Sequence, residues 1–269
     1  MITKQHLVIV LTVASLLSCA TAAERETGAA RGTVTGDSAA AGKLMLAVKE
    51  INDNSPATIS TSFTADGASN GQKFKIEGTA VFDRKCCFKI SVVDYVFRSR
   101  VLDAYREMDS LYFYYPAEKK LLVDDVYKID IFRYTGFQTS FDIMYTLLTG
   151  GIPMLKDSSV TKCVAGTEAD SFNLVLENSE YMQNIYFKGS VPERIMIIHK
   201  STKDRMEIYL KSRITKDKSV FFKNIRIVAP EKNISANINF LSPSLNAEIK
   251  PEKFKREVFK KDVEVIKVN

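Results

Sequence analysis

The sequence of 269 residues predicts a mainly β protein with few helices, built on an antiparallel sheet that curves into an unclosed barrel. Three observations predict this fold class. Apolar and polar residues alternate along many short segments, these segments are spaced almost regularly, and helical periodicity is rare. A dry face and a wet face on each strand are typical of antiparallel sheets, not of βαβ units. About ten or eleven strands at this spacing favour a barrel or a strongly curved sheet.

The alternation is clearest in residues 73–82, where Phe74, Ile76, Ala80 and Phe82 share one face. It recurs in residues 88–92, with Phe88 and Ile90 on the dry face, and in residues 205–211 and 234–240. Further candidate strands, which are shorter or less regular, are residues 59–65, 111–115, 120–124, 172–177, 184–187, 194–199 and 220–228.

Two segments are predicted to be helices. Residues 43–52 form a short amphipathic helix at the start of the domain. Residues 140–149 form the second helix, which has Thr139 or Ser140 as N-cap and is stopped by Gly150-Gly151-Ile152-Pro153. Its apolar residues, which cover most of its circumference, are Phe141, Ile143, Met144, Tyr145, Leu147 and Leu148. A helix so apolar must be buried on most sides, so we expect the sheet to wrap around it, with a lesser helical turn in residues 127–137 nearby.

The N-terminus indicates export. Lys4 precedes an apolar run over residues 7–17, which suits a signal-peptide core and is too short to cross a bilayer. The run ends in Leu16-Leu17-Ser18-Cys19, which looks like a lipobox and makes Cys19 the expected lipid attachment site. The alternative is an ordinary secretory signal cut after Ala22 or Ala23.

The expected organisation is a lipoprotein signal peptide over residues 1–18, the acylated cysteine with a flexible tether over residues 19–42, and one domain over residues 43–269. The tether is predicted because residues 20–42 hold almost nothing large and apolar. The net charge of +6 is mild and does not suggest nucleic acid. Adjacent residues in a strand face opposite sides, so Cys86 and Cys87 are poorly placed to bond to each other. One of them could pair with Cys163, or all three thiols are buried.

Enzymatic activity is not predicted. After the signal peptide the chain has one histidine, His199, at the end of an apolar strand, where a structural role is the commoner one. The sequence contains no Gly-x-Ser-x-Gly, no phosphate-binding loop and no His-Glu-x-x-His, so we expect no catalytic residue, cofactor or metal.

Three stretches of the chain resemble the LolA/LolB family of lipoprotein-sorting proteins, and its outer-membrane LolB receptors most. They are FKISVVDYVFRSRVLDAYREMDSLYFYYPAEKKLLVDD, FQTSFDIMYTLLTGGIP and FKREVFKKDVEVIKV. The resemblance covers less than half of the chain and includes no catalytic signature. The chain departs from the family in having no tryptophan, and residues 160–187 fit the pattern less clearly.

The resemblance implies an antiparallel half-barrel with a helical lid over an apolar cavity that takes acyl chains. The residues expected to bind an acyl chain lie on the dry strand faces and on the second helix: Phe74, Ile76, Phe88, Ile90, Phe141, Ile143, Met144, Leu147 and Leu148. The alternative is that the same side chains fill an ordinary core.

A hairpin at residues 92–97 is unusually apolar for a turn, and in the family this position is a loop that touches the membrane. Carried over, the contact residues are Val93, Tyr95 and Val96, unless the segment is a buried strand pair. The basic run over residues 250–261 could rest on anionic headgroups or could be a solvated edge.

Together these features predict a monomeric lipoprotein anchored in the cell envelope. Ala20 after the cysteine favours the outer membrane, facing the periplasm. The expected function is to receive or transfer lipoproteins or lipids. The expected partners are acyl chains of lipoproteins or phospholipids, the membrane surface and a periplasmic carrier protein, with no nucleic acid. The competing function is that of a non-catalytic structural or surface-exposed binding lipoprotein.

Overall fold

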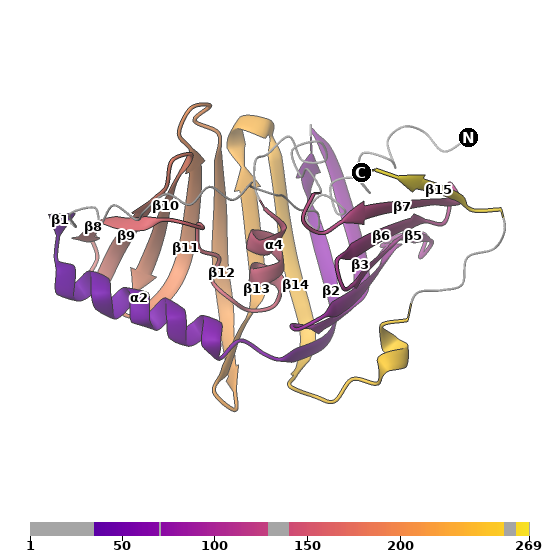
Figure 1. Ribbon diagram of the computed structural model, residues 1–269, viewed down its shortest axis with the longest axis horizontal. Coiled ribbons are helices and arrows are strands. Elements are labelled where there is room, and N and C mark those ends of the chain that lie inside the picture. The colour runs from indigo at the N-terminus through magenta and orange to yellow at the C-terminus, as the bar shows by residue number, and fades with distance from the viewer. Residues whose placement is uncertain (1–34, 70, 129–139, 256–261, 269) are drawn as a thin grey trace.

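The computed structural model describes residues 35–69, 71–128, 140–255 and 262–268. Their strands form one sheet in the order β1-β8-β9-β10-β11-β12-β13-β14-β2-β3-β4-β5-β6-β7-β15. Because β1 and β15 lie at opposite ends of this order, the sheet does not close. Figure 1 shows it as a curved, strongly twisted half-barrel, with β5–β7 running across the direction of β10–β14. The predicted unclosed antiparallel barrel is confirmed.

Two halves of the chain build the two halves of the sheet. The first half comprises β2 (Thr58–Ser69), β3 (Gln72–Asp83), β4 (Cys87–Asp94), β5 (Arg100–Glu107), β6 (Ser110–Tyr115) and β7 (Lys120–Asp125). The second comprises β8 (Ser159–Ala165), β9 (Ser171–Glu177), β10 (Tyr181–Lys188), β11 (Val191–His199), β12 (Arg205–Lys216), β13 (Ser219–Ala229) and β14 (Ile234–Leu245). Antiparallel pairing of β14 with β2 joins them.

The two outermost pairings of the sheet are parallel. The short strand β1 (Thr35–Gly36) pairs with β8, and β15 (Glu264–Lys267) pairs with β7. To reach β7 from β14, the chain passes the 3-10 turn η2 (Pro251–Lys253) and crosses to the far edge of the sheet (Figure 1). A further 3-10 turn, η1 (Pro230–Lys232), connects β13 to β14. Residues 264–267, in the C-terminal stretch that resembles the LolA/LolB family, therefore form a parallel edge strand.

Side chains of the concave face form the core, as the period-two pattern predicts. Along β2, β3 and β4 the buried residues alternate with exposed or half-buried ones. Glycines bring these strands unusually close: a Cβ on Gly67 would lie 2.0 Å from the carbonyl oxygen of Ser235, and one on Gly78 would lie 2.3 Å from that of Ser91. A side chain at either position would push neighbouring strands apart, so both glycines permit the strong curvature.

Helix α2 (Ser38–Asp53) lies along the β8–β12 side of the concave face (Figure 1). It begins five residues before the predicted start at residue 43, with Asp37 as N-cap, because the run of alanines after Ser38 favours a helix. The structured domain thus begins inside the segment predicted as a tether. The predicted tether residues 19–34 lie outside the described residues.

Helix α4 (Phe141–Leu148) is the second predicted helix. The Ser140 hydroxyl accepts a hydrogen bond from the Ile143 amide at 3.3 Å, and Gly150 ends the helix with φ of +88°. Figure 1 shows α4 within the curve of the sheet, in front of β13 and β14. The helical turn predicted for residues 127–137 falls largely outside the described residues. Of the helices that are described, none has the length and apolar character needed to span a membrane.

The cysteine pairing differs from the prediction. Cys86 is bonded to Cys87, and Cys163 is a free, buried thiol on β8. Cys86 lies in the turn between β3 and β4, so the rule that adjacent strand residues face opposite sides does not apply to it. The expectation that Cys86 and Cys87 cannot pair was wrong for this reason.

Candidate functional site

An aromatic cluster holds α4 on the concave face. The Phe141 ring stacks on the Tyr145 ring at 5.2 Å between centroids, and Phe88 of β4 lies 6.2 Å from Phe141. Phe82 of β3 meets Tyr145 edge-on at 6.3 Å. The Arg106 guanidinium lies 5.5 Å from the Phe141 ring centroid and 5.3 Å from that of Tyr145. The contact is thus apolar and aromatic, with one cation against its edge.

The Tyr145 hydroxyl links α4 to the sheet by a side-chain hydrogen bond. It donates to the carbonyl oxygen of Asp83 at 2.9 Å. Burial raises the pKa of Tyr145 to about 12, against a smaller lowering by Arg106. The phenol therefore stays neutral and keeps its proton for this hydrogen bond throughout the physiological range.

All nine residues predicted to bind an acyl chain lie in one buried apolar cluster. Four belong to the sheet and five to α4, and each is at most 9% exposed. The strand residues lie on the concave face, and those of α4 complete the opposite side of the contact. In this arrangement α4 covers the apolar surface, so the site is closed.

Two side-chain amides, one half-buried and one buried, fix the segment that follows α4. The Asn52 side chain at the end of α2 accepts from the Ile152 amide at 2.6 Å and donates to the Ile152 carbonyl at 2.9 Å. Gln183 of β10 is fully buried, accepts from the Leu155 amide at 3.1 Å and donates to the Pro153 carbonyl at 2.7 Å. The C-terminal side of α4 is therefore anchored to α2 and to the sheet.

The sequence prediction did not include Asn52 or Gln183. Gln183 lies at a concave-face position of β10, and a polar side chain there needs a buried partner. A polar residue at an apolar-face position was the signal in the sequence that could have identified Gln183. Its partner could not be predicted, because the partner depends on the path of residues 152–155.

The hairpin between β4 and β5 exposes three consecutive large side chains, Tyr95, Val96 and Phe97, which we call the hairpin tip. They are 40%, 74% and 78% exposed. The Asp94 carboxylate accepts hydrogen bonds from the Val96 and Phe97 amides at 2.9 and 2.7 Å, so the turn is well formed. Val93, which was predicted with them, lies in β4 and is half-buried.

Cations surround the hairpin tip. The Lys75 ammonium lies 3.7 Å from the centre of the Tyr95 ring, and Arg98 forms an ion pair with Glu77. Phe97 was not among the predicted contact residues, although it is the most exposed residue of the tip. Its position at the apex follows from the Asp94 turn, which the alternation pattern alone does not locate.

No family model matches the sequence, and no curated protein matches it. Solved structures resemble the fold. A DUF1329 family protein from Desulfovibrio piger has a TM-score of 0.57 and 11% identity, over 81% of this chain and 98% of that one. A LolA superfamily protein from Nitrosomonas europaea has a TM-score of 0.54 and 6% identity, over 79% of this chain and 97% of that one. The fold of this chain therefore resembles the folds of these two proteins. A domain from Vibrio parahaemolyticus that is assigned to outer-membrane lipoprotein sorting also resembles the fold. It has a TM-score of 0.54 and 11% identity, over 80% of this chain and 97% of that one.

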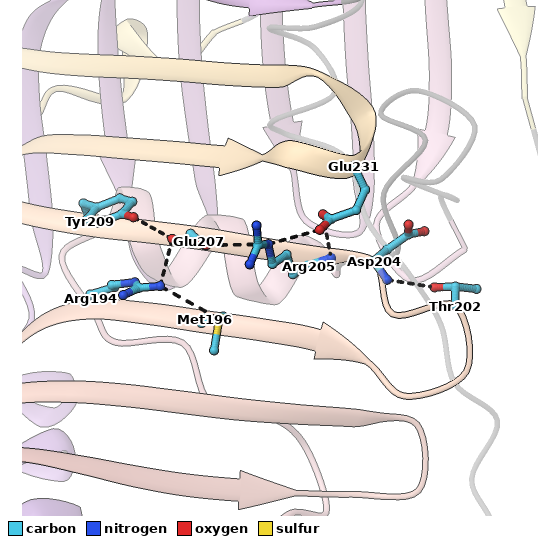
Figure 2. Close-up of polar contacts among 8 residues, drawn as sticks. All are labelled: Arg194, Met196, Thr202, Asp204, Arg205, Glu207, Tyr209 and Glu231. Carbon is cyan, nitrogen blue, oxygen red and sulfur yellow. Dashed lines mark hydrogen bonds and ion pairs between the residues drawn. The ribbon is translucent and has the colours of Figure 1, made fainter. Parts of the chain in front are cut away.

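The convex face of the sheet carries a polar cluster, shown in Figure 2. Glu207 of β12 pairs with Arg194 at 3.0 Å and accepts a hydrogen bond from the Tyr209 hydroxyl at 2.5 Å. Arg205 lies 3.7 Å from Glu207 and 3.1 Å from Glu231. The hydrogen bond to Glu207 raises the pKa of Tyr209. The carboxylate is held between two cations and a phenol, so it fastens β11, β12 and η1 together and is not poised as a base.

The remaining predicted features lie elsewhere in the structure. The His199 ring accepts from the Thr202 amide at 3.2 Å and lies edge-on to Tyr181, so it organises the turn after β11. Within the described ranges, His, Cys, Asp and Glu side chains form no group of three suited to a metal ion. Cys19 lies outside the described residues, as does half of the basic run over residues 250–261.

Proposed function

We propose that the chain is a membrane-anchored periplasmic lipoprotein that binds acyl chains between α4 and the concave face of the sheet. It receives or transfers lipoproteins or lipids at the outer membrane. One observation carries the proposal: an almost wholly apolar helix lies in the curve of an apolar half-barrel, with the Tyr145 hydroxyl donating to the carbonyl oxygen of Asp83 on the sheet. The LolA-superfamily fold supports it.

The free energy gained by burying an acyl chain on the sheet is similar to that gained by burying α4 there. Each methylene removed from water contributes about 0.8 kcal/mol, so a C16 chain gains on the order of 10 kcal/mol on entering an apolar site. The five buried side chains of α4 contribute about 1.5–3 kcal/mol each, a total of the same order. An acyl chain can therefore replace α4 on the sheet, and α4 can expel the chain when the membrane receives it.

The rest of the chain supplies attachment and delivery. Acylation of Cys19 anchors the protein, residues 19–34 form the tether, and Ala20 favours the outer membrane. The hairpin tip inserts its exposed side chains into the membrane surface while Lys75 and Arg98 lie beside anionic headgroups. The expected partners are acylated cargo, the membrane and a periplasmic carrier protein.

The competing function is that of a structural or surface-exposed binding lipoprotein whose core is permanently filled. The burial of the nine acyl-binding residues in this structure favours it. Native mass spectrometry of the Cys19→Ser variant, which carries no acyl chain of its own, separates the two. Co-purified lipid, or uptake of a fluorescent fatty acid that palmitate displaces, supports the carrier. A clean protein mass without uptake contradicts it.

Delivery is tested at the hairpin tip. The variant Val96→Ser/Phe97→Ser should bind the fluorescent fatty acid normally and transfer it to vesicles several-fold more slowly. Met108→Ser is the matched control, because Met108 is 81% exposed at the turn between β5 and β6. Equal transfer by both variants would refute membrane contact at the tip. In cells, a sorting role predicts that depletion of the protein strands other lipoproteins in the inner membrane.

A further inference from the structure

The convex face of the sheet carries a cavity of about 600 Å³. This volume is in the range of small-molecule sites and is several times that of a phosphate group. Its floor is formed by outward-facing side chains of three neighbouring strands: Ser60, Ser62, Thr79, Val81, Lys89 and Ser91. The cavity therefore lies on the opposite side of the sheet from the acyl-binding face.

Strand register arranges the floor as two rows. Ser62 of β2 pairs with Thr79 of β3, which pairs with Ser91 of β4, so three hydroxyls lie side by side. Ser60, Val81 and Lys89 form the next row in the same way. Short hydroxyl side chains across three strands leave a depression, and each hydroxyl is both a donor and an acceptor.

The walls come from β14 and the segment that follows it. β14 shifts its register against β2 between Leu241 and Ser244, and Ser242 has φ of +47°. Such a bulge bends a strand and re-aims its side chains. Beyond β14, Lys253 of η2 also lines the cavity, and Lys89 donates to the Lys255 carbonyl at 3.4 Å. This hydrogen bond holds the residues just after η2 against this face.

The charge in the cavity is positive. Lys89 and Lys253 are its ionisable lining residues, and neither ammonium has a carboxylate within ion-pair distance in the described part of the chain. The nearest acidic position by register is Asp103, opposite Ser91, and its carboxylate pairs with Arg100 at 2.8 Å. The two ammonium groups lie beside a row of hydroxyls, and together these groups would attract and bind an anionic ligand.

We propose that this convex-face cavity binds a phosphorylated polyol, either a free sugar phosphate or the same group on a lipid. A phosphate monoester carries close to two negative charges at neutral pH, which matches the two ammonium groups. The hydroxyl row of Ser62, Thr79 and Ser91 bonds to the hydroxyls of the polyol. The volume left beside the phosphate accommodates the polyol ring. This site lies on the opposite side of the sheet from the acyl-binding face, so it does not depend on the proposed function.

Calorimetry on the full chain in detergent tests the site with glucose 6-phosphate, using glucose and inorganic phosphate as reference ligands. Binding of glucose 6-phosphate should be tighter than that of either reference. It should weaken about tenfold or more in Lys89→Gln/Lys253→Gln, since each charge-assisted hydrogen bond contributes about tenfold. Lys211→Gln, an exposed lysine on the convex face of β12, is the matched control and should change nothing.

Vesicles distinguish the source of the ligand. Lysine-dependent binding to phosphatidylcholine vesicles that contain phosphatidylinositol phosphate, without binding of glucose 6-phosphate, assigns the site to a lipid headgroup. Lysine-dependent binding of glucose 6-phosphate assigns it to a soluble ligand. Absence of both, or equal losses in the double variant and in Lys211→Gln, would overturn the proposal. Fatty-acid uptake by the double variant should equal that of the wild type, so failure here is distinct from failure of the acyl-binding proposal.

Discussion

The buried amide of Gln183 provides the sharpest test of how α4 is anchored. In the variant Gln183→Leu, a side chain of similar volume keeps the packing on β10 and removes both hydrogen bonds to residues 153–155. The Leu155 amide and the Pro153 carbonyl are then left without their partner in a buried place. Each unsatisfied group costs about 1–3 kcal/mol, so unfolding should become easier by about 2–5 kcal/mol.

Urea unfolding measures this loss of stability. The variant should unfold at a lower midpoint concentration of urea, while the dependence of its unfolding free energy on urea stays unchanged. The matched control is Asn237→Leu, which removes an amide on the convex face whose hydrogen bond to Asp66, at 3.0 Å, is exposed. It should cost about 0.5 kcal/mol or less. Hydrogen exchange of the Leu155 amide gives a local reading and should accelerate in Gln183→Leu. A loss equal to that of the control, with Leu155 still protected, would refute the anchor.

Three other predictions follow from single contacts. Tyr145→Phe removes the hydrogen bond to Asp83, so it should lower the free energy of unfolding by about 0.5–1.5 kcal/mol. It should also speed fatty-acid uptake. Unchanged uptake kinetics would show that this hydrogen bond does not restrain α4. The pKa of Tyr145 in the folded state, about 12, exceeds its unfolded value of about 10. Its stabilisation is therefore complete below pH 10 and is lost as the pH rises through 12. This loss should amount to about 2–3 kcal/mol in alkaline unfolding of the wild type and should be absent in Tyr145→Phe. Glu207→Gln should lower the pKa of Tyr209, and tyrosinate absorbance would contradict the assignment if it titrated unchanged.

Period-two alternation was sufficient to predict most of the fold. It located most of the strands, although not β5 or β8, and it assigned Phe74, Ile76, Phe88 and Ile90 to the dry face, because side-chain direction in a strand is fixed by position alone. It could not predict that β1 and β15 pair in parallel, since edge pairing depends on where distant segments meet.

The candidate sites depend more on tertiary contacts. Helix α4 was predicted from its caps and its all-round apolar surface, which are local signals. The sequence did not predict the hydrogen bonds of Asn52 and Gln183 or the hydroxyl row of the convex-face cavity. The hydrogen bonds join residues that are 100 and about 30 positions apart in the chain, and the cavity forms only when β14 pairs with β2. Such contacts are set by sheet order and register, which local patterns do not encode.

The methionine methyl groups provide the most direct test of acyl binding under α4. Met144 of α4 and Met206 on the concave face are buried, whereas Met196 lies on the convex face and Met108 in an exposed turn. In methyl NMR spectra of the chain labelled at methionine, a spin-labelled fatty acid should broaden the signals of Met144 and Met206 and leave those of Met196 and Met108 sharp. Broadening confined to Met196 and Met108, or no broadening at saturating fatty acid, would contradict an acyl site between α4 and the sheet.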